Sequence, residues 1–116
     1  MINLYLDDYR PCPKGFALAR DGEECLMMLR ESEVHILSLD HELGFGQMDG
    51  TDVVKAMVNE GLFANEIYLH TSSMSGRKRM YELLYQAKPE HVILHDGAMP
   101  AELLSDIANQ ASQGQG

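Results

Sequence analysis

Four short apolar segments of this chain each run directly into an ionisable residue. The segments cover residues 2–6, 34–39, 66–69 and 91–94, and they are followed by Asp7 and Asp8, Asp40, His70 and His95. Short runs rich in β-branched and aromatic residues predict buried β-strands. Because the carboxyl ends of parallel strands meet at one edge of a sheet, these polar residues are predicted to share that edge.

Segments with apolar residues at helical spacing separate the strands. Asp21, with Glu24 three residues later, is a candidate N-cap for the first helix, and Ser75 is one for the third. The predicted helices follow Asp21, Gly50, Ser75 and Pro100, and the second and third end at Gly61 and Pro89. This alternation predicts one α/β domain over residues 1–111 with a doubly wound parallel sheet. The polar residues 112–116 are predicted to form a disordered tail.

The connection after the first strand departs from this regular alternation. Pro11 and Pro13 oppose a helix in residues 9–15, and a further strand is predicted at residues 16–19. A helical crossover needs at least about 10 residues, so we expect an extended loop here. One face of the sheet then lacks a covering helix, which makes a homo-oligomer a candidate assembly.

Composition narrows the classes of protein. The chain has 116 residues, of which 45% are hydrophobic, enough for one core. Its net charge of −9 repels polyanions, so we expect no extended nucleic-acid binding. The two cysteines lack metal-ligand spacing, and neither a membrane-spanning run nor a signal-peptide pattern is present, so we expect a cytoplasmic protein with no membrane contact.

Several motifs occur in an order that resembles bacterial response-regulator receiver domains. They are INLYLDD, ARDGEECL, HILSLDHELG, MDG and YLHTSS. The resemblance implies a flavodoxin-like fold with five parallel strands in the order 2-1-3-4-5. It also implies a metal-binding acidic pair at Asp7 and Asp8, a phosphoacceptor at Asp40, and a phosphate-sensing hydroxyl at Thr71 or Ser72.

The sequence departs from the receiver pattern at two places. His95, Asp96 and Gly97 stand where a receiver has lysine followed by proline, and a loop replaces the first helix. Together with LDDYRPCP, SLDHELG and the His70 of HTSS, these departures more closely resemble the family called cyclic-phosphate-processing receiver-like domains. That resemblance implies a receiver fold directed toward phosphoester chemistry.

The carboxylates Asp7, Asp8 and Asp40 are predicted to converge where the strand order reverses. Three carboxylates in one crevice repel one another, so either a pKa rises or a cation enters. Hard oxygen ligands favour Mg²⁺, and a histidine ligand would admit Mn²⁺. The alternative is that Asp7 or Asp8 only caps a loop.

Three histidines are predicted at the same edge, namely His41, His70 and His95. Because histidine titrates near neutral pH, they are candidates for general acid, general base or metal ligand, and His41 is a candidate for the pocket wall. For each, the alternative is a hydrogen bond to a loop carbonyl.

Four further residues are candidates for phosphate binding. The hydroxyls of Thr71 and Ser72 suit phosphate oxygens, or they belong to a polar loop before a helix. Arg77 lies near a predicted helix start, where a bound phosphate would offset its unfavourable charge. Arg10 suits a bidentate phosphate contact, or a surface ion pair with Asp8 or Glu42.

Two functions follow from these candidates. One is hydrolysis of a cyclic phosphate or related phosphoester, with Asp40, His70 and His95 catalytic. The other is a signalling receiver phosphorylated on Asp40. A scaffold that binds only a metal or a partner is a third interpretation.

Overall fold

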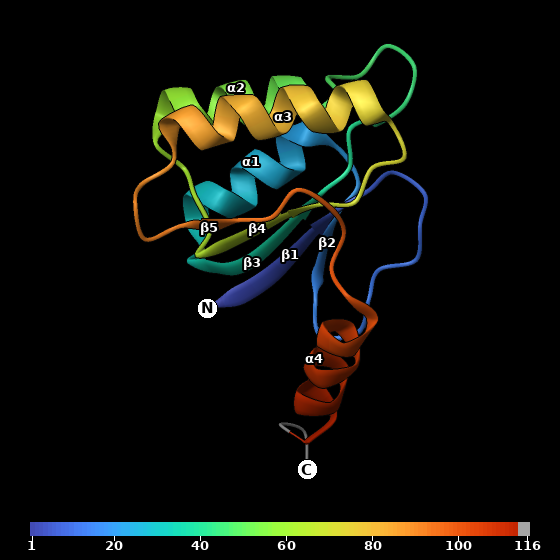
Figure 1. The fold of residues 1–116 in the computed structure, drawn as a ribbon. Helices are drawn as coiled ribbons and strands as arrows, with labels where there is room; N and C mark the ends of the chain where they lie inside the picture. The colour runs from blue at the N-terminus through green and yellow to red at the C-terminus, as the bar shows by residue number, and fades with distance from the viewer. Residues whose placement is uncertain (114–116) are drawn as a thin grey trace.

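The protein, described here by a computed structural model over residues 1–113, is built on five parallel strands (Figure 1). The strands are β1 (Ile2–Leu6), β2 (Ala17–Ala19), β3 (Val34–Leu39), β4 (Glu66–Leu69) and β5 (Ile93–Leu94). Their order is β2-β1-β3-β4-β5, which confirms the predicted 2-1-3-4-5 sheet. The fifth strand is shorter than predicted, because the Val92 amide donates to Pro89 O in a turn and pairing with β4 begins only at Ile93.

Four helices connect or follow the strands: α1 (Gly22–Glu31), α2 (Gly50–Glu60), α3 (Met74–Ala87) and α4 (Ala101–Gln113). Asp21 caps α1 by accepting from the Glu24 amide, as predicted. The cap of α3 is Ser73, not the predicted Ser75, because the Ser73 hydroxyl accepts from the Gly76 amide at 3.1 Å. Ser75 therefore lies inside the first turn.

An extended loop joins β1 to β2 in place of a helix, as predicted. The Arg20 side chain holds this loop, donating through Nη1 to the backbone oxygens of Asp7 at 3.2 Å and Arg10 at 2.9 Å. Gly15 packs closely on Ile107 of α4. The loop is thus fixed at both ends, which positions the residues that directly follow β1.

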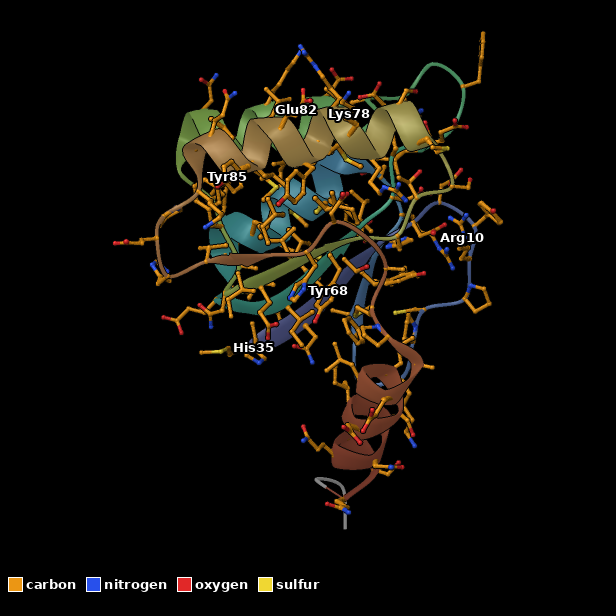
Figure 2. The ribbon with its side chains drawn as sticks, in the orientation of Figure 1. Arg10, His35, Tyr68, Lys78, Glu82 and Tyr85 are labelled. Atoms are coloured by element: carbon orange, nitrogen blue, oxygen red, sulfur yellow. The ribbon has the colours of Figure 1, made fainter. Side chains whose placement is uncertain are left out.

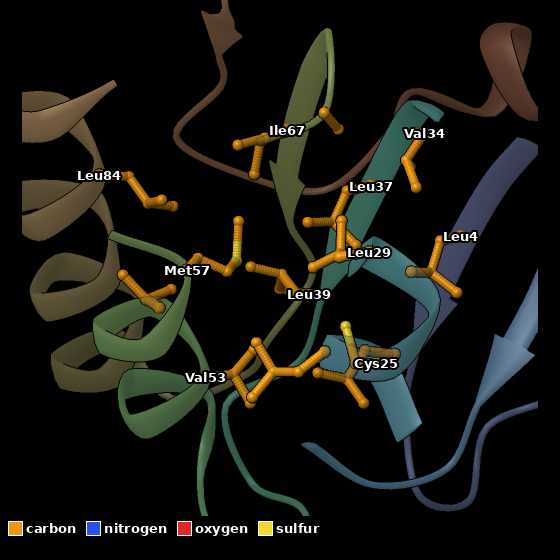
Figure 3. Packing of buried hydrophobic residues seen from close by; sticks show 14 of the residues in the cluster. Leu4, Cys25, Leu29, Val34, Leu37, Leu39, Val53, Met57, Ile67 and Leu84 are labelled. Atoms are coloured by element: carbon orange, nitrogen blue, oxygen red, sulfur yellow. The ribbon is translucent and has the colours of Figure 1, made fainter. Parts of the chain in front are cut away.

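The two faces of the sheet are covered differently (Figure 1). Helices α1, α2 and α3 lie on one face over the main core, in which Leu4, Leu37 and Leu39 of the strands contact helix residues such as Val53 and Met57 (Figure 3). The other face carries a smaller cluster of five buried residues: Tyr5, Ile36, Tyr68, Met99 and Ile107. Helix α4 therefore covers the second face only in part, beside the loop that replaces the first helix.

The last helix extends further than expected. It continues through Gln113, so residues 112 and 113 of the predicted disordered tail are helical. Residues 114–116 of that tail lie outside the described part of the chain. Among residues 1–113, none of the helices has the length and apolar character that a bilayer crossing requires.

Candidate functional site

Three of the predicted residues meet at the carboxyl edge of the sheet. Asp7, Asp40 and His70 follow β1, β3 and β4, and the parallel hydrogen-bond ladder continues into each of them: the Asp40 amide donates to Leu6 O and the His70 amide to Leu39 O. Their ligand atoms lie within 4.8 Å of one another. Asp7 is 0% and Asp40 3% exposed. Two carboxylates buried this deeply require positive charge or hydrogen-bond donors beside them.

Asp7 receives donors on both carboxylate oxygens. Its Oδ1 accepts the backbone amides of Tyr9 at 3.0 Å and Arg10 at 2.9 Å. Its Oδ2 accepts Arg10 Nη1 at 2.8 Å and His70 Nε2 at 2.9 Å. Burial raises the pKa of Asp7, but the hydrogen bonds from Arg10, Tyr9 and His70 outweigh it and lower the pKa to about 2. Asp7 is therefore ionised at neutral pH.

Arg10 bridges the two buried carboxylates. In addition to its contact with Asp7, Nη1 lies 3.1 Å from Asp40 Oδ2, and the guanidinium lies over the Tyr9 ring, 4.9 Å from its centroid. Figure 2 shows Arg10 on the loop after β1, at the opposite end of the sheet from His35. The hydrogen bond to Asp7 raises the pKa of Arg10, so the guanidinium stays charged. The predicted alternative, an ion pair of Arg10, is thus realised, but with Asp7 and Asp40 rather than with Asp8 or Glu42.

His70 is held through both ring nitrogens. Nδ1 lies 2.6 Å from Ser38 Oγ, Nε2 contacts Asp7, and the ring stacks on Tyr5 with centroids 4.3 Å apart. Burial, the largest effect, lowers the pKa of His70. A neutral ring beside an ionised Asp7 carries its proton on Nε2, so Nδ1 accepts from the Ser38 hydroxyl.

Asp8 lies next to this group without joining it. Its Oδ1 is buried and has no hydrogen-bond partner among residues 1–113, and the side chain lines a hollow of about 620 Å³ together with Tyr9 and the loop residues 41–47. An orphaned carboxylate oxygen beside two further carboxylates is the donor chemistry that Mg²⁺ prefers. Asp7, Asp40 and His70 therefore lie close enough together to fit a divalent cation, and Asp8 offers a further carboxylate next to them.

His41 borders the same hollow, but its ring packs elsewhere. Nε2 lies 3.2 Å from Thr51 Oγ1 and 3.7 Å from Asp49 Oδ2, at the start of α2. A Cβ on Gly76 of α3 would fall 2.4 Å from His41 Cγ. His41 thus connects the loop after β3 to the first turns of two helices.

The structure does not bring His95 to this group. Its Nε2 lies 3.1 Å from Glu66 Oε1, and its ring stacks on Tyr68 with centroids 4.0 Å apart. Glu66 is the first residue of β4, whereas His70 follows the last. The His95 ring therefore points along the strand away from Asp7 and Asp40.

The candidate phosphate ligands also separate. Thr71 is buried beside His70, and its Oγ1 accepts from the Ser73 amide, while Ser72 is exposed. Arg77 instead pairs with Asp96, with 3.4 Å between Nε and Oδ1. Of the predicted cations, only Arg10 contacts the acidic group in the described residues.

Two residues of the site were missed from the sequence. Ser38 is fully buried and reaches His70, and its signal was a lone hydroxyl residue in the apolar run VHILSL, two positions before Asp40 and hence on the same face of the strand. Arg20 acts only through backbone oxygens of a loop, for which the sequence carries no pattern.

The parallel 2-1-3-4-5 sheet with acidic residues after β1 and β3 defines a domain of the receiver class. Solved structures agree on the fold. The Francisella response regulator 1452 receiver domain is 14% identical, with 96% of each chain covered and a TM-score of 0.56. A CheY-like response regulator receiver domain protein from Methanospirillum hungatei is 16% identical, with 99% of this chain and 98% of that chain covered and a TM-score of 0.50.

Within this class, the sequence matches one family over residues 2–86, described as "Cyclic-phosphate processing Receiver domain". The chain belongs to this family of cyclic-phosphate processing receiver domains. A search of curated proteins gives no significant match.

Proposed function

We propose that the edge formed by Asp7 and Asp40 binds a cyclic phosphate or related phosphoester together with a divalent cation, and that the domain hydrolyses it. The observation that carries the proposal is the position of Arg10, whose guanidinium lies between the two carboxylates beside His70. A planar cation of this kind is suited to bidentate contact with phosphate oxygens. Membership of the cyclic-phosphate processing family supports the same choice of substrate.

The proposed cation is Mg²⁺ or Mn²⁺, held by Asp7, Asp8 and Asp40. When bound, it would neutralise negative charge that develops on the phosphoryl oxygens. The Arg10 side chain, 29% exposed, supplies the remaining contact to the phosphate. The hydroxyls of Thr71 and Ser72, directly after His70, are proposed to contact the same anion.

Ring opening requires one P–O bond to form and one to break. In the direct route, the Asp40 carboxylate takes a proton from water as the water oxygen bonds to phosphorus, the ring P–O bond breaks, and the proton passes to the departing alkoxide. In the covalent route, the Asp40 carboxylate attacks phosphorus and the ring P–O bond breaks. The alkoxide takes a proton from water, and the resulting hydroxide hydrolyses the acyl phosphate and releases Asp40. Both routes use the Asp40 carboxylate as the reacting group.

His70 has a different proposed role from the acid or base expected at first. Because Ser38 and Asp7 occupy both of its nitrogens, His70 orients the Asp7 carboxylate and takes up a proton only if one of these bonds opens. The proposal leaves out His95 as an acid or base, since Glu66 and Tyr68 hold its ring apart from the carboxylates.

The test is incubation of the purified protein with a 2′,3′-cyclic nucleotide and Mg²⁺ or Mn²⁺, with the ring-opened monoester measured by chromatography. We expect turnover that Asp40→Asn abolishes and that His70→Ala reduces, while His95→Gln, the matched histidine control, leaves it unchanged. Equal turnover by the wild type and Asp40→Asn, or none by the wild type, would overturn the proposal.

A second candidate function is that of a phosphoacceptor receiver. Arg10 Nη1, 3.1 Å from Asp40 Oδ2, would supply the cation that the missing lysine supplies in the receiver pattern. Acetyl phosphate separates the two functions. Stable labelling of the wild type, lost in Asp40→Asn and without turnover of the cyclic nucleotide, would favour the receiver.

A further inference from the structure

Arg10 occupies the carboxylate oxygens that a divalent cation would need. Its Nη1 contacts Oδ2 of Asp7 at 2.8 Å and Oδ2 of Asp40 at 3.1 Å, and both carboxylates are buried. A divalent cation at the same oxygens would therefore face a full positive charge at close range. The guanidinium and the cation exclude each other from these two oxygens.

The Arg10 side chain can leave without moving its backbone. The backbone at residues 7 and 10 is fixed by Arg20, and the Arg10 amide donates to Asp7 Oδ1. The guanidinium end is partly exposed and lies over the Tyr9 ring, which is 69% exposed. Motion is thus confined to the side chain, and the solvent side of the site is open to it.

We propose that Arg10 is a movable counter-ion that makes the binding of a phosphate group and of a divalent cation at this site mutually dependent. An incoming phosphate offers the guanidinium fork two oxygens and draws it away from the carboxylates. The freed oxygens of Asp7 and Asp40 then accept the cation. This inference rests on the proposed function for the identity of the site, but it concerns binding alone.

Reciprocity follows from linkage. If phosphate raises the affinity for the cation by some factor, the cation raises the affinity for phosphate by the same factor. Without phosphate, Arg10 stabilises the two buried carboxylates and keeps the affinity for the cation low. The site then assembles fully only when both parts of a metal-bound phosphoester are present.

The test uses Mg²⁺ and inorganic phosphate as probes of the intact chain. The dissociation constant for Mg²⁺ is measured by calorimetry with and without phosphate, and the Arg10 Nε–H signal is followed by NMR, assigned by its absence from the spectrum of Arg10→Lys. We expect Mg²⁺ to bind between about 5-fold and 150-fold more tightly with phosphate, the usual range of coupling between sites. The Arg10 signal should shift as phosphate is added.

Variants sharpen the test. Arg10→Met should bind Mg²⁺ more tightly than the wild type in the absence of phosphate and should lose the coupling. Arg30→Met is the matched control, because Arg30 pairs with Glu60 on the exposed surface between α1 and α2, so it removes the same charge elsewhere and should keep the coupling. If Arg10→Met fails to fold, the wild-type calorimetry and NMR decide alone.

Two results would overturn the inference: Mg²⁺ affinity independent of phosphate in the wild type, or an Arg10 signal that does not respond to phosphate. These outcomes are separate from those of the hydrolysis assay. Coupled binding without turnover would leave Arg10 as a movable counter-ion and reject the hydrolase. Turnover with uncoupled binding would support the hydrolase and reject Arg10 as a movable counter-ion.

Discussion

The Ser38 hydroxyl lies 2.6 Å from Nδ1 of His70, on the side of the ring opposite Asp7. The imidazole thus joins three neighbouring strands, because its partners lie on β3 and directly after β1 while His70 itself follows β4. With Asp7 ionised, this arrangement selects one tautomer and aligns one oxygen of Asp7 between His70 and Arg10. The orientation of the buried carboxylate therefore depends on a serine that does not contact it.

Replacing Ser38 by alanine should leave Nδ1 of His70 buried without a donor. We expect a loss of about 1–3 kcal/mol in the free energy of unfolding, the usual penalty for an unsatisfied buried polar group. Urea unfolding measures it, with Ser105→Ala on the exposed surface of α4 as the control. Equal stability of the two variants would mean that the Ser38 to His70 bond contributes nothing.

The low pKa of Asp7 makes stability depend on acid pH. Its pKa is about 2 in the folded protein, below the ordinary value of 3.8, so the stabilisation is fully present above pH 3.8 and is lost as the pH falls toward 2. A difference of this size corresponds to about 2 kcal/mol. Unfolding in urea with EDTA should show this loss in the wild type. Asp7→Asn should be less stable at pH 7, and its free energy of unfolding should change less between pH 4 and pH 2.

His70 contributes a second pH dependence in a higher window. Burial lowers its pKa in the folded state from 6.5, so below pH 6.5 the unfolded chain binds a proton that the folded protein does not. Stability should fall as the pH decreases through this window and should level off below the folded pKa. The check is the difference in unfolding free energy between the wild type and His70→Gln from pH 8 to pH 5. A constant difference would show that the folded state does not disfavour the imidazolium.

The sequence was sufficient to predict which residues lie at the carboxyl edge of the sheet, but not the directions in which their side chains point. Apolar runs that end at Asp7, Asp40 and His70 predict adjacent ends because parallel strands share a polarity. His95 followed the same rule and yet contacts Glu66, since a side chain at the end of a two-residue strand can turn back along its neighbour. The direction of the strands predicts where the backbone of a residue lies, whereas hydrogen-bond partners such as Glu66 determine the rotamer of its side chain.

Arg10 illustrates a second limit. Its position two residues after the acidic pair makes it a candidate for phosphate binding, but no sequence pattern places it on Asp40, 30 positions away. That contact requires the extended loop to turn back over the sheet edge. The hydrogen bonds of Arg20 to the loop backbone and of the Arg10 amide to Asp7 Oδ1 stabilise this turn. Contacts of loops without regular structure are not encoded in any short period of the sequence.

Gly76 gives a test whose sign is unusual. In an ordinary helix, replacing glycine by alanine stabilises the protein by about 0.5–1 kcal/mol. The reason is that glycine has more conformational freedom in the unfolded chain and loses more of it when the helix forms. Here an added Cβ would lie 2.4–2.6 Å from ring atoms of His41, and that ring contacts Thr51 on its other side. The ring is also only 19% exposed, so it has little room to withdraw. Overpacking of this kind usually destabilises by about 1–3 kcal/mol, so we expect Gly76→Ala to unfold at lower urea concentration.

Ser75→Ala, one residue earlier on the exposed surface of α3, is the control, and its stability should change little. A more stable Gly76→Ala would show that His41 does not pack tightly between the first turns of α2 and α3, and that the loop after Asp40 is held by other contacts.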